Sequence, residues 1–169
     1  LEAIRAGTVQ PGKYLVLIGG DTASVEEAVV AGRSAAAGAL VDVILLPDVH
    51  LDVVQAVGGA RRASQAEALG VIETSTVAAT IGAADAGIKG AAVELLEIRM
   101  ADGLGGKAYV LFGGTVFDVQ AAVEIGVGRL EAEQLVGRVV IPRLHPEMSE
   151  NLWADPRFAG RVRSADEGD

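Results

Sequence analysis

Three patterns in this chain of 169 residues could take part in ligand binding or catalysis: a glycine-lysine loop, a pair of histidines and two acidic residues on apolar elements. The segment Gly7–Lys13 has the Gly-x4-Gly-Lys spacing of a phosphate loop. Such a loop continues with Ser or Thr and opens a helix, whose N-terminus faces the phosphate. Tyr14 follows here and begins a run typical of a strand. The pattern therefore favours a turn over a nucleotide site.

The only histidines, His50 and His145, could in principle share a metal ion. Neither has a metal-ligand pattern beside it at helical spacing, so a histidine in a hydrogen-bonded turn is favoured. Glu73 and Asp85 lie on core-adjacent elements, where structural hydrogen bonding is favoured over catalysis. No Ser-His-Asp or paired-carboxylate arrangement follows from spacing. The sequence predicts no catalytic residue, no metal and no cofactor.

The amino-acid composition limits the kinds of site that the protein can form and the kinds of molecule that it can bind. The absence of cysteine excludes disulfides, thiolate metal sites and cysteine nucleophiles. A net charge of −9 argues against a nucleic-acid surface, which needs clustered Lys and Arg. Charged residues interrupt every apolar run before it reaches the ~18 residues of a membrane span. We expect neither nucleic acid nor membrane as a partner.

An internal repeat organises the chain. The segment 12–20 aligns with 106–114 at the offset that takes Lys13 to Lys107, which is 94 residues. The Pro-x-x-His segments at 47–50 and 142–145 align at an offset of 95. Gly-Lys, Gly-Gly and Pro-x-x-His landmarks in one order argue against chance, so the chain contains two copies of one unit.

The second copy has the pattern of an α/β (α+β) fold with order β-α-β-β-α-β, the ferredoxin-like arrangement of two helices on one face of an antiparallel sheet. Ser75 or Thr76 can cap the first helix, and Thr115 with Asp118 resembles a capping box at the second. The expected strands are 68–73, 93–100, 107–113 and 135–141, and the expected helices are 77–90 and 116–130.

The first copy begins at the second strand of this pattern, with strands at 1–6, 13–19 and 41–46 and a helix at 22–37. Without the remaining strand and helix its sheet would expose an apolar face and an open edge. We therefore expect that residue 1 is not the natural start of the protein. The expected divisions are an N-terminally incomplete first domain at 1–57, a linker at 58–67, a complete second domain at 68–148 and a tail at 149–169, whose end at 164–169 is expected to be disordered.

Several ordered motifs of the second copy resemble the bacterial microcompartment shell domain: ALGVIET at 68–74, AADAGIKGA at 83–91, VEL at 93–95 and VIPRLH at 140–145. The resemblance covers 68–148 closely and 1–50 loosely. Two such domains resemble the tandem-domain shell class, whose members form trimers that mimic a hexamer. The resemblance implies that the protein is a structural shell protein and not an enzyme. It also implies that the protein lies in the microcompartment shell in the bacterial cytoplasm. Its implied partners are two further copies in a homotrimer, hexameric and pentameric shell tiles, and small polar metabolites that cross a central pore.

By this resemblance, the loop between the second and third strands of each copy lines the pore. The two loops differ, so the pore would be three-fold in chemistry, with three Asp102 carboxylates that disfavour anions. Spacing alone leaves open whether the glycines serve only as positive-φ turns or allow several chains to approach an axis. The positions assigned to the pore are Ala101, Asp102, Gly103, Leu104 and Gly105 in the second copy and Thr8, Val9 and Gln10 in the first.

The resemblance also assigns tile-edge contacts to Lys89 and Arg143. The alternative for Lys89 is a solvated lysine at a helix end, and the first copy has Asp48 where Arg143 would stand. Some tandem shell proteins hold an iron–sulfur cluster at the pore through cysteine, and this chain has none. A different function, an oligomeric small-molecule-binding regulatory module on a ferredoxin-like fold, is the alternative. An enzyme ranks last.

Overall fold

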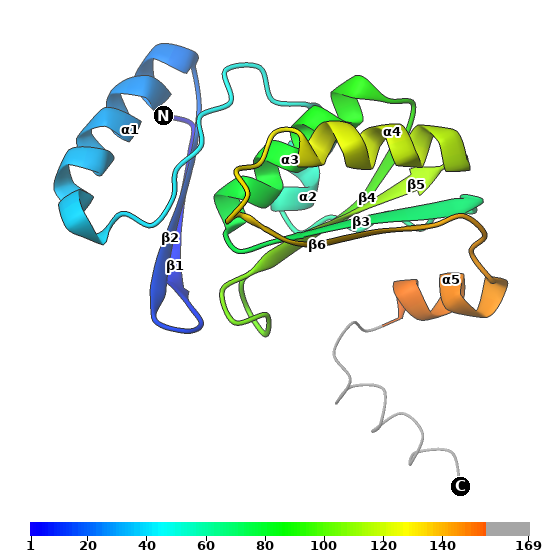
Figure 1. Cartoon of the computed structure of the whole chain (residues 1–169). Coiled ribbons are helices and arrows are strands. Elements are labelled where there is room, and N and C mark those ends of the chain that lie inside the picture. The colour runs from blue at the N-terminus through cyan, green and yellow to red at the C-terminus, as the bar shows by residue number, and fades with distance from the viewer. Residues whose placement is uncertain (155–169) are drawn as a thin grey trace, which may run out of the picture.

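The second copy forms a complete layered unit in the computed structural model, which describes residues 1–154. The expected disorder at 164–169 lies outside the described residues. Two helices cover one face of a four-stranded sheet (Figure 1). Its elements are β3 (Ala68–Thr74), α3 (Val77–Gly90), β4 (Glu94–Met100), β5 (Ala108–Gly114), α4 (Val116–Val127) and β6 (Leu135–Ile141).

The strand order β4-β5-β3-β6, with every neighbouring pair antiparallel, confirms the predicted ferredoxin-like topology. Alternate residues of β5 point under the helices, where Val110 and Phe112 are fully buried. The helices begin at the predicted caps: Thr76 accepts from Ala79 N–H, and Thr115 accepts from Asp118 N–H. Local capping and periodicity therefore agree with the tertiary fold in this copy.

Glycines let α3 and α4 pack closely. A Cβ on Gly126 of α4 would lie 2.9 Å from the carbonyl oxygen of Ala83 in α3. A Cβ on Gly87 of α3 would lie 3.0 Å from the Ala122 carbonyl oxygen and 2.6 Å from Cζ of Phe112. All three distances are shorter than ordinary van der Waals contact, so each helix approaches the other through a position that has room only for hydrogen.

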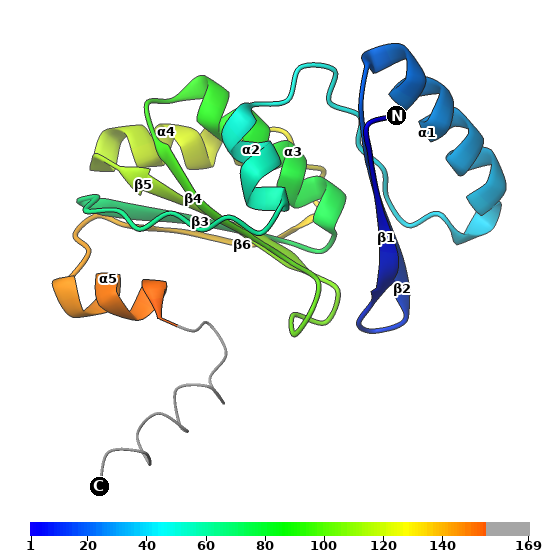
Figure 2. The same cartoon turned by 180° about the vertical axis from the view of Figure 1, so that it is seen from behind.

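The first copy consists of a separate two-stranded hairpin and one helix (Figures 1 and 2). Strand β1 (Ala3–Val9) pairs antiparallel with β2 (Lys13–Gly19), and α1 (Thr22–Ala36) follows. Asp21 caps α1 by accepting from Ser24 N–H at 2.9 Å. No residue of α1 is buried. This copy therefore has a hairpin and a helix but little core of its own.

The predicted strand at 41–46 is wrong, because this segment is extended but unpaired. Its counterpart β6 pairs with β3, and the described residues of the first copy contain no counterpart of β3. The segment lies instead along α3: Asp42 accepts from the Thr76 hydroxyl, Ile44 lies against Gly82, and the Asp48 carbonyl accepts from Lys89. Six extended residues span about 20 Å, and the fourteen residues of α3 span about 21 Å, so the two lengths match.

Two short helices follow the Pro-x-x-His segments and were not predicted. Helix α2 (Leu51–Val57) packs on β4 and α3 of the second copy, and it buries Val53 and Ala56 there. Helix α5 (Pro146–Trp153) lies on the sheet face opposite α3 and α4 (Figure 1). It crosses the expected boundary between the second domain and the tail.

Candidate functional site

The two predicted pore loops meet at one end of the molecule. The turns of the β1–β2 and β4–β5 hairpins lie side by side, and the strands of the two hairpins run from these turns in different directions (Figures 1 and 2). A Cβ on Gly106 would lie 2.9 Å from the Gln10 carbonyl oxygen and 3.1 Å from Cδ of Pro11. The loops of the two copies are therefore in direct contact, a proximity that sequence spacing could not show.

The second-copy loop is built around a run of positive φ angles. Gly103, Gly105 and Gly106 have φ of 76°, 64° and 78°, which favours glycine at each position. Ala101 also has a positive φ, of 50°, and its carbonyl accepts from Leu104 N–H and Gly106 N–H. Its side chain is 0% exposed, so Ala101 anchors the loop to the core. Asp102, Gly103 and Gly105 are exposed, and Leu104 is half-buried.

The first-copy loop differs in chemistry. Thr8 and Gln10 are exposed, whereas Val9 is half-buried and packs against the core of the second copy. The segment turns from one strand directly into the next, so the Gly-x4-Gly-Lys pattern lies in a β-hairpin. The prediction that it is not a helix-opening phosphate loop is confirmed.

Lys89 lies at the boundary between the two copies. Its ammonium group donates to the Asp48 carbonyl of the first copy and to Asp85 Oδ2 at 2.7 Å. The other carboxylate oxygen of Asp85 accepts from His50 N–H at 2.8 Å, and Asp85 is buried. Asp85 thus has the structural role that the sequence favoured, and it ties α3 to the turn that ends the first copy.

Arg143 is exposed just after β6, and it makes no hydrogen bond or ion pair with Lys89. The two histidines are N-caps: His50 Nδ1 accepts from Asp52 N–H at 3.2 Å, and His145 Nδ1 accepts from Glu147 N–H at 3.3 Å. A histidine in a hydrogen-bonded turn was the favoured interpretation, and the acid two residues on was the missed signal for a helix. Among the described residues, no three acidic or histidine side chains could hold a metal ion together.

A second charged cluster lies on the opposite face of the sheet. Arg61 of the linker pairs with the buried Glu97 of β4 at 3.1 Å, and it donates to the Leu152 carbonyl near the end of α5. Burial raises the pKa of Tyr109 above its usual value, and the negative charge of Glu97 raises it further. Glu73 pairs with Lys107, which is again a structural contact.

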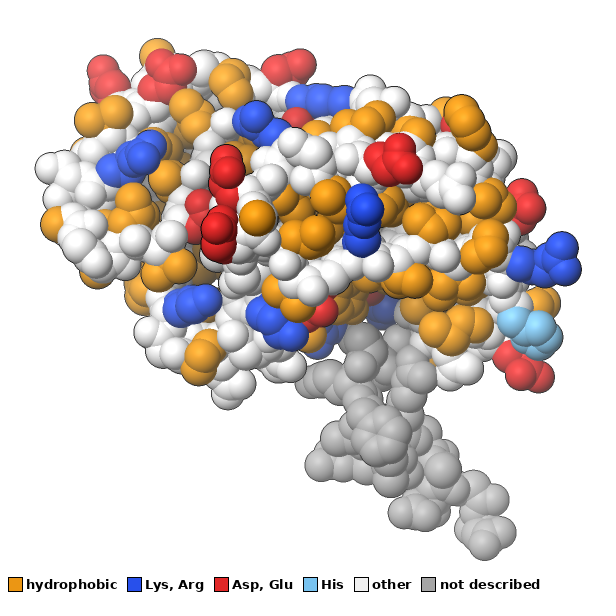
Figure 3. All heavy atoms as spheres, viewed as in Figure 1, with side chains coloured by type: hydrophobic (Ala, Val, Ile, Leu, Met, Phe, Trp, Pro, Cys, Tyr) orange, Lys and Arg blue, Asp and Glu red, His pale blue; other side chains and the backbone are white. Residues whose placement is uncertain are grey.

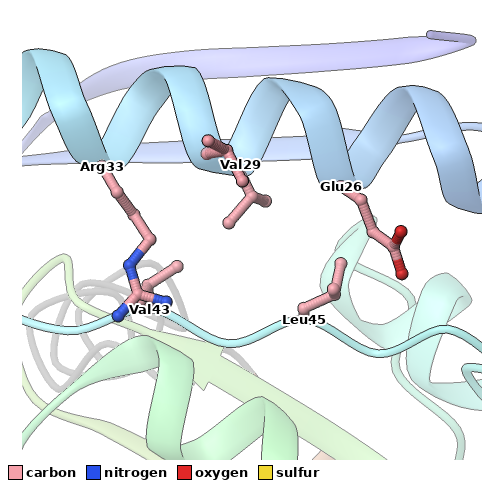
Figure 4. A pocket seen from close by; sticks show the side chains of 6 residues that line it. Glu26, Val29, Arg33, Val43 and Leu45 are labelled. Carbon is pink, nitrogen blue, oxygen red and sulfur yellow. The ribbon is translucent and has the colours of Figure 1, made fainter.

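The first copy carries a shallow apolar groove of about 290 Å³ between α1 and the segment 43–45. Val29, Val43 and Leu45 face one another across it, with Glu26 and Arg33 at its ends (Figure 4). No helix in the described part of the chain is long and apolar enough to cross a bilayer.

Known proteins resemble this chain along most of its length. The family model of the BMC domain matches residues 1–49 and 68–144. The chain is 42% identical over 147 residues to the bacterial microcompartment shell protein PduT of Citrobacter freundii, covering 86% of this chain and 78% of that protein. It is 36% identical over 85 residues to the bacterial microcompartment shell protein EutM of Salmonella typhimurium, covering 50% of this chain and 86% of that one. The crystal structure of a microcompartments protein from Desulfitobacterium hafniense matches with a TM-score of 0.77 at 42% identity, covering 86% of this chain and 82% of that chain.

Proposed function

The chain belongs to the BMC domain family of bacterial microcompartment shell proteins, and we propose that three copies close into a pseudohexameric shell tile with a central pore. Each chain contributes two successive sectors of the ring. A closed three-fold ring uses one heterologous interface repeated three times. The tile is a structural component, and the pore carries small polar metabolites.

The observation that carries this proposal is the convergence of two equivalent hairpins on one point. Gly106 and Gln10 touch, and β1–β2 and β4–β5 spread away from that contact (Figure 1). In a ring, such hairpin turns surround the axis. The exposed glycines of the second-copy loop keep the approach to that axis free of side chains.

The pore would alternate two kinds of loop. The second copy contributes Asp102, Gly103, Leu104 and Gly105, and the first contributes Thr8, Val9 and Gln10. Three Asp102 carboxylates and three Gln10 amides then surround one channel. The carboxylates favour cations and neutral solutes over anions, while amide and hydroxyl groups offer hydrogen bonds to polar metabolites.

Contacts with other shell tiles complete the proposal. Arg143 is exposed beyond β6, where it can meet a neighbouring tile. Lys89 keeps only part of its side chain exposed, because its ammonium is bonded to Asp85 and Asp48. We assign Arg143 to the tile edge as a contact residue, and Lys89 as a residue whose ammonium also joins the two copies.

Electron microscopy and native mass spectrometry of the purified protein test the ring. The expected result is a trimer that appears as a six-lobed ring with an axial hole, alone or in hexagonal sheets. A monomer or dimer with no ring at micromolar concentration would contradict the proposal. A ligand-induced rise in melting temperature without assembly would support a regulatory module instead.

The pore charge has its own test. Three charges that each act across roughly 8 Å of water contribute about 0.5 kcal/mol apiece. Their removal shifts the barriers of anions and cations by about 1.5 kcal/mol in opposite directions, so at low salt Asp102→Asn should raise anion passage relative to cation passage about a hundredfold. The measurement is the relative rate at which anionic and cationic solutes of similar size cross sheets or closed shells assembled from the tiles. Asp118→Asn, which lies at the start of α4 away from the loops, is the control. An unchanged ratio for Asp102→Asn would show that these carboxylates do not face the channel.

A further inference from the structure

The repeat places two residues of opposite charge at equivalent positions. At the offset of 95 that aligns the two Pro-x-x-His segments, Asp48 of the first copy is the counterpart of Arg143 of the second. Both residues are exposed. In the described part of the chain neither side chain takes part in a hydrogen bond or an ion pair, since Lys89 bonds only the backbone carbonyl of Asp48. Each charge is therefore available to a partner outside the chain.

Both residues lie at the end of the molecule that faces away from the hairpin turns. Strand β6 meets β3 there through the pair Leu69–Ile141, and Arg143 follows β6. Helix α3 runs from the turn end of β3 back to this end, where Lys89 donates to the Asp48 carbonyl. In the space-filling view, acidic and basic side chains stand along the outline on the sides away from the turns (Figure 3). Because the turns surround the axis of the proposed ring, Asp48 and Arg143 lie at its outer edge.

The two edge segments also differ in their apolar surface. Helix α2 begins at Leu51, three residues after Asp48, and Leu51 and Val54 are 66% and 50% exposed. Their counterparts at the offset of 95 are Pro146 and Ser149 of α5. The Asp48 edge thus combines a carboxylate with apolar surface. An ion pair that forms beside such a surface is less screened than one in open water.

The geometry of a hexagonal sheet decides which edges can meet. Around a tile of three chains the Asp48 edge and the Arg143 edge alternate, so opposite sides of a tile are unlike. If all tiles have the same orientation, every contact joins an Asp48 edge to an Arg143 edge. Joining like edges requires each neighbour to be turned by one sixth of a turn, and three tiles that meet at a corner cannot all be turned relative to one another. Only contacts between unlike edges can repeat throughout the sheet.

We propose that the Asp48 edge of one tile binds the Arg143 edge of a neighbouring tile of this same protein; this rests on the trimeric ring proposed above. The charges agree with the geometry. Like edges would bring together two carboxylates or two guanidinium groups, whereas unlike edges let the Arg143 guanidinium donate to the Asp48 carboxylate. The chain has a net charge of −9, so tiles repel one another overall, and a complementary pair selects this one contact.

Sheet formation by the purified protein, followed by light scattering and electron microscopy, tests this contact with Asp48→Arg and Arg143→Asp. Reversing one exposed ion pair weakens a contact about fivefold, and each tile accounts for about three contacts in a sheet, so either variant should raise the protein concentration needed for sheets about a hundredfold. The double variant Asp48→Arg with Arg143→Asp restores opposite charges at every contact. It should form sheets at about the wild-type concentration.

The matched control is Glu124→Arg, the same change of charge at an exposed position of α4, between the edge and the hairpin turns. This variant has the same net charge as Asp48→Arg, and both changes reduce the overall repulsion between tiles. If net charge alone governed assembly, both would form sheets more readily than the wild type. Under the proposal, Asp48→Arg assembles less readily and Glu124→Arg does not.

Native mass spectrometry separates the edge contact from the ring, because all of these variants should remain trimers. Averaged images of wild-type sheets should show every tile in one orientation. Wild-type trimers that form no sheets, single variants that form sheets like the wild type, or a double variant that is not restored would each overturn the edge contact and leave the ring intact. A wild type that never trimerises would overturn the ring itself, and this proposal with it.

Discussion

Alanine at Gly126 and alanine at Gly32 should change the stability of this chain in opposite directions. The two glycines are repeat counterparts, 94 residues apart, in α4 and α1. A Cβ on Gly126 would lie 2.9 Å from the Ala83 carbonyl oxygen and 2.7 Å from Ile72 Cδ1. A Cβ on Gly32 would meet no heavy atom within 4 Å. The same chemical change therefore meets a packed helix crossing in one copy and open space in the other.

The expected magnitudes follow from two opposing terms. Alanine is favoured over glycine inside a helix by about 1 kcal/mol. Forcing a methyl group into a closely packed site costs about 1–3 kcal/mol, and the two contacts under 3.0 Å at Gly126, one of them with a backbone oxygen, place its cost in the upper part of this range, at about 2–3 kcal/mol. Gly32→Ala should therefore raise the free energy of unfolding by about 0.5–1 kcal/mol, and Gly126→Ala should lower it by about 1–2 kcal/mol. The difference in melting temperature is then about 5–10 °C for a chain of this size.

Thermal and urea unfolding followed by far-UV circular dichroism measure both changes. If the copies unfold in separate steps, each variant should shift the transition of its own copy. A destabilising Gly32→Ala would refute the conclusion that this face of α1 is open. A neutral Gly126→Ala would refute the conclusion that the backbone of α3 limits the helix crossing.

Two further changes test the charged contacts. Asp85→Ala should lower the free energy of unfolding by about 2–3 kcal/mol, because it leaves the His50 amide and the Lys89 ammonium without their buried acceptor; urea unfolding measures it. Ultraviolet titration should show Tyr109 ionising above the usual tyrosine pKa, because burial and then the Glu97 charge disfavour the phenolate. The folded state holds the Tyr109 proton more tightly than the unfolded state does. This group's contribution to the free energy of unfolding is therefore fully present below the pKa of Tyr109 in the unfolded state, and it is lost as the pH rises through the pKa in the folded state.

Each of these predictions has a control in the same chain. Glu147→Gln removes an exposed carboxylate 4.0 Å from His145, and its effect should stay within about 0.5 kcal/mol. Tyr109→Phe should remove the late step of the ultraviolet titration. An Asp85→Ala variant as stable as wild type, or a Tyr109 that ionises at the ordinary tyrosine pKa, would contradict the corresponding prediction.

The second copy could be predicted from sequence because local signals and the fold agree there. The helix Val77–Gly90 and the strand Leu135–Ile141 have the predicted bounds. The segment 41–46 could not be predicted in this way, because a strand depends on a partner that periodicity does not reveal. This segment has the same residue pattern as β6, but it forms no strand, because it lies along α3 and not beside another strand.

The candidate site shows a similar division. Glycines with positive φ were foreseeable at the second loop, but the contact between Gly106 and Gln10 joins segments that are far apart in the chain. Family resemblance named Lys89 as an edge residue, and only the structure shows its bonds to Asp48 and Asp85. The short helices α2 and α5 were not predicted from the sequence, because histidine is an unusual N-cap residue.

The contacts between the copies also bear on how a ring could assemble. Segment 42–48 follows α3 from Thr76 to Lys89, and the hairpin turns meet at Gly106. These contacts fix the two sectors relative to each other within one chain, where no translational entropy is lost on forming them. A ring of six separate domains needs five association steps and one closure, whereas a ring of three such chains needs two association steps and one closure. Because only those two association steps cost translational and rotational freedom, the interchain surface can remain small and partly polar and still close the ring.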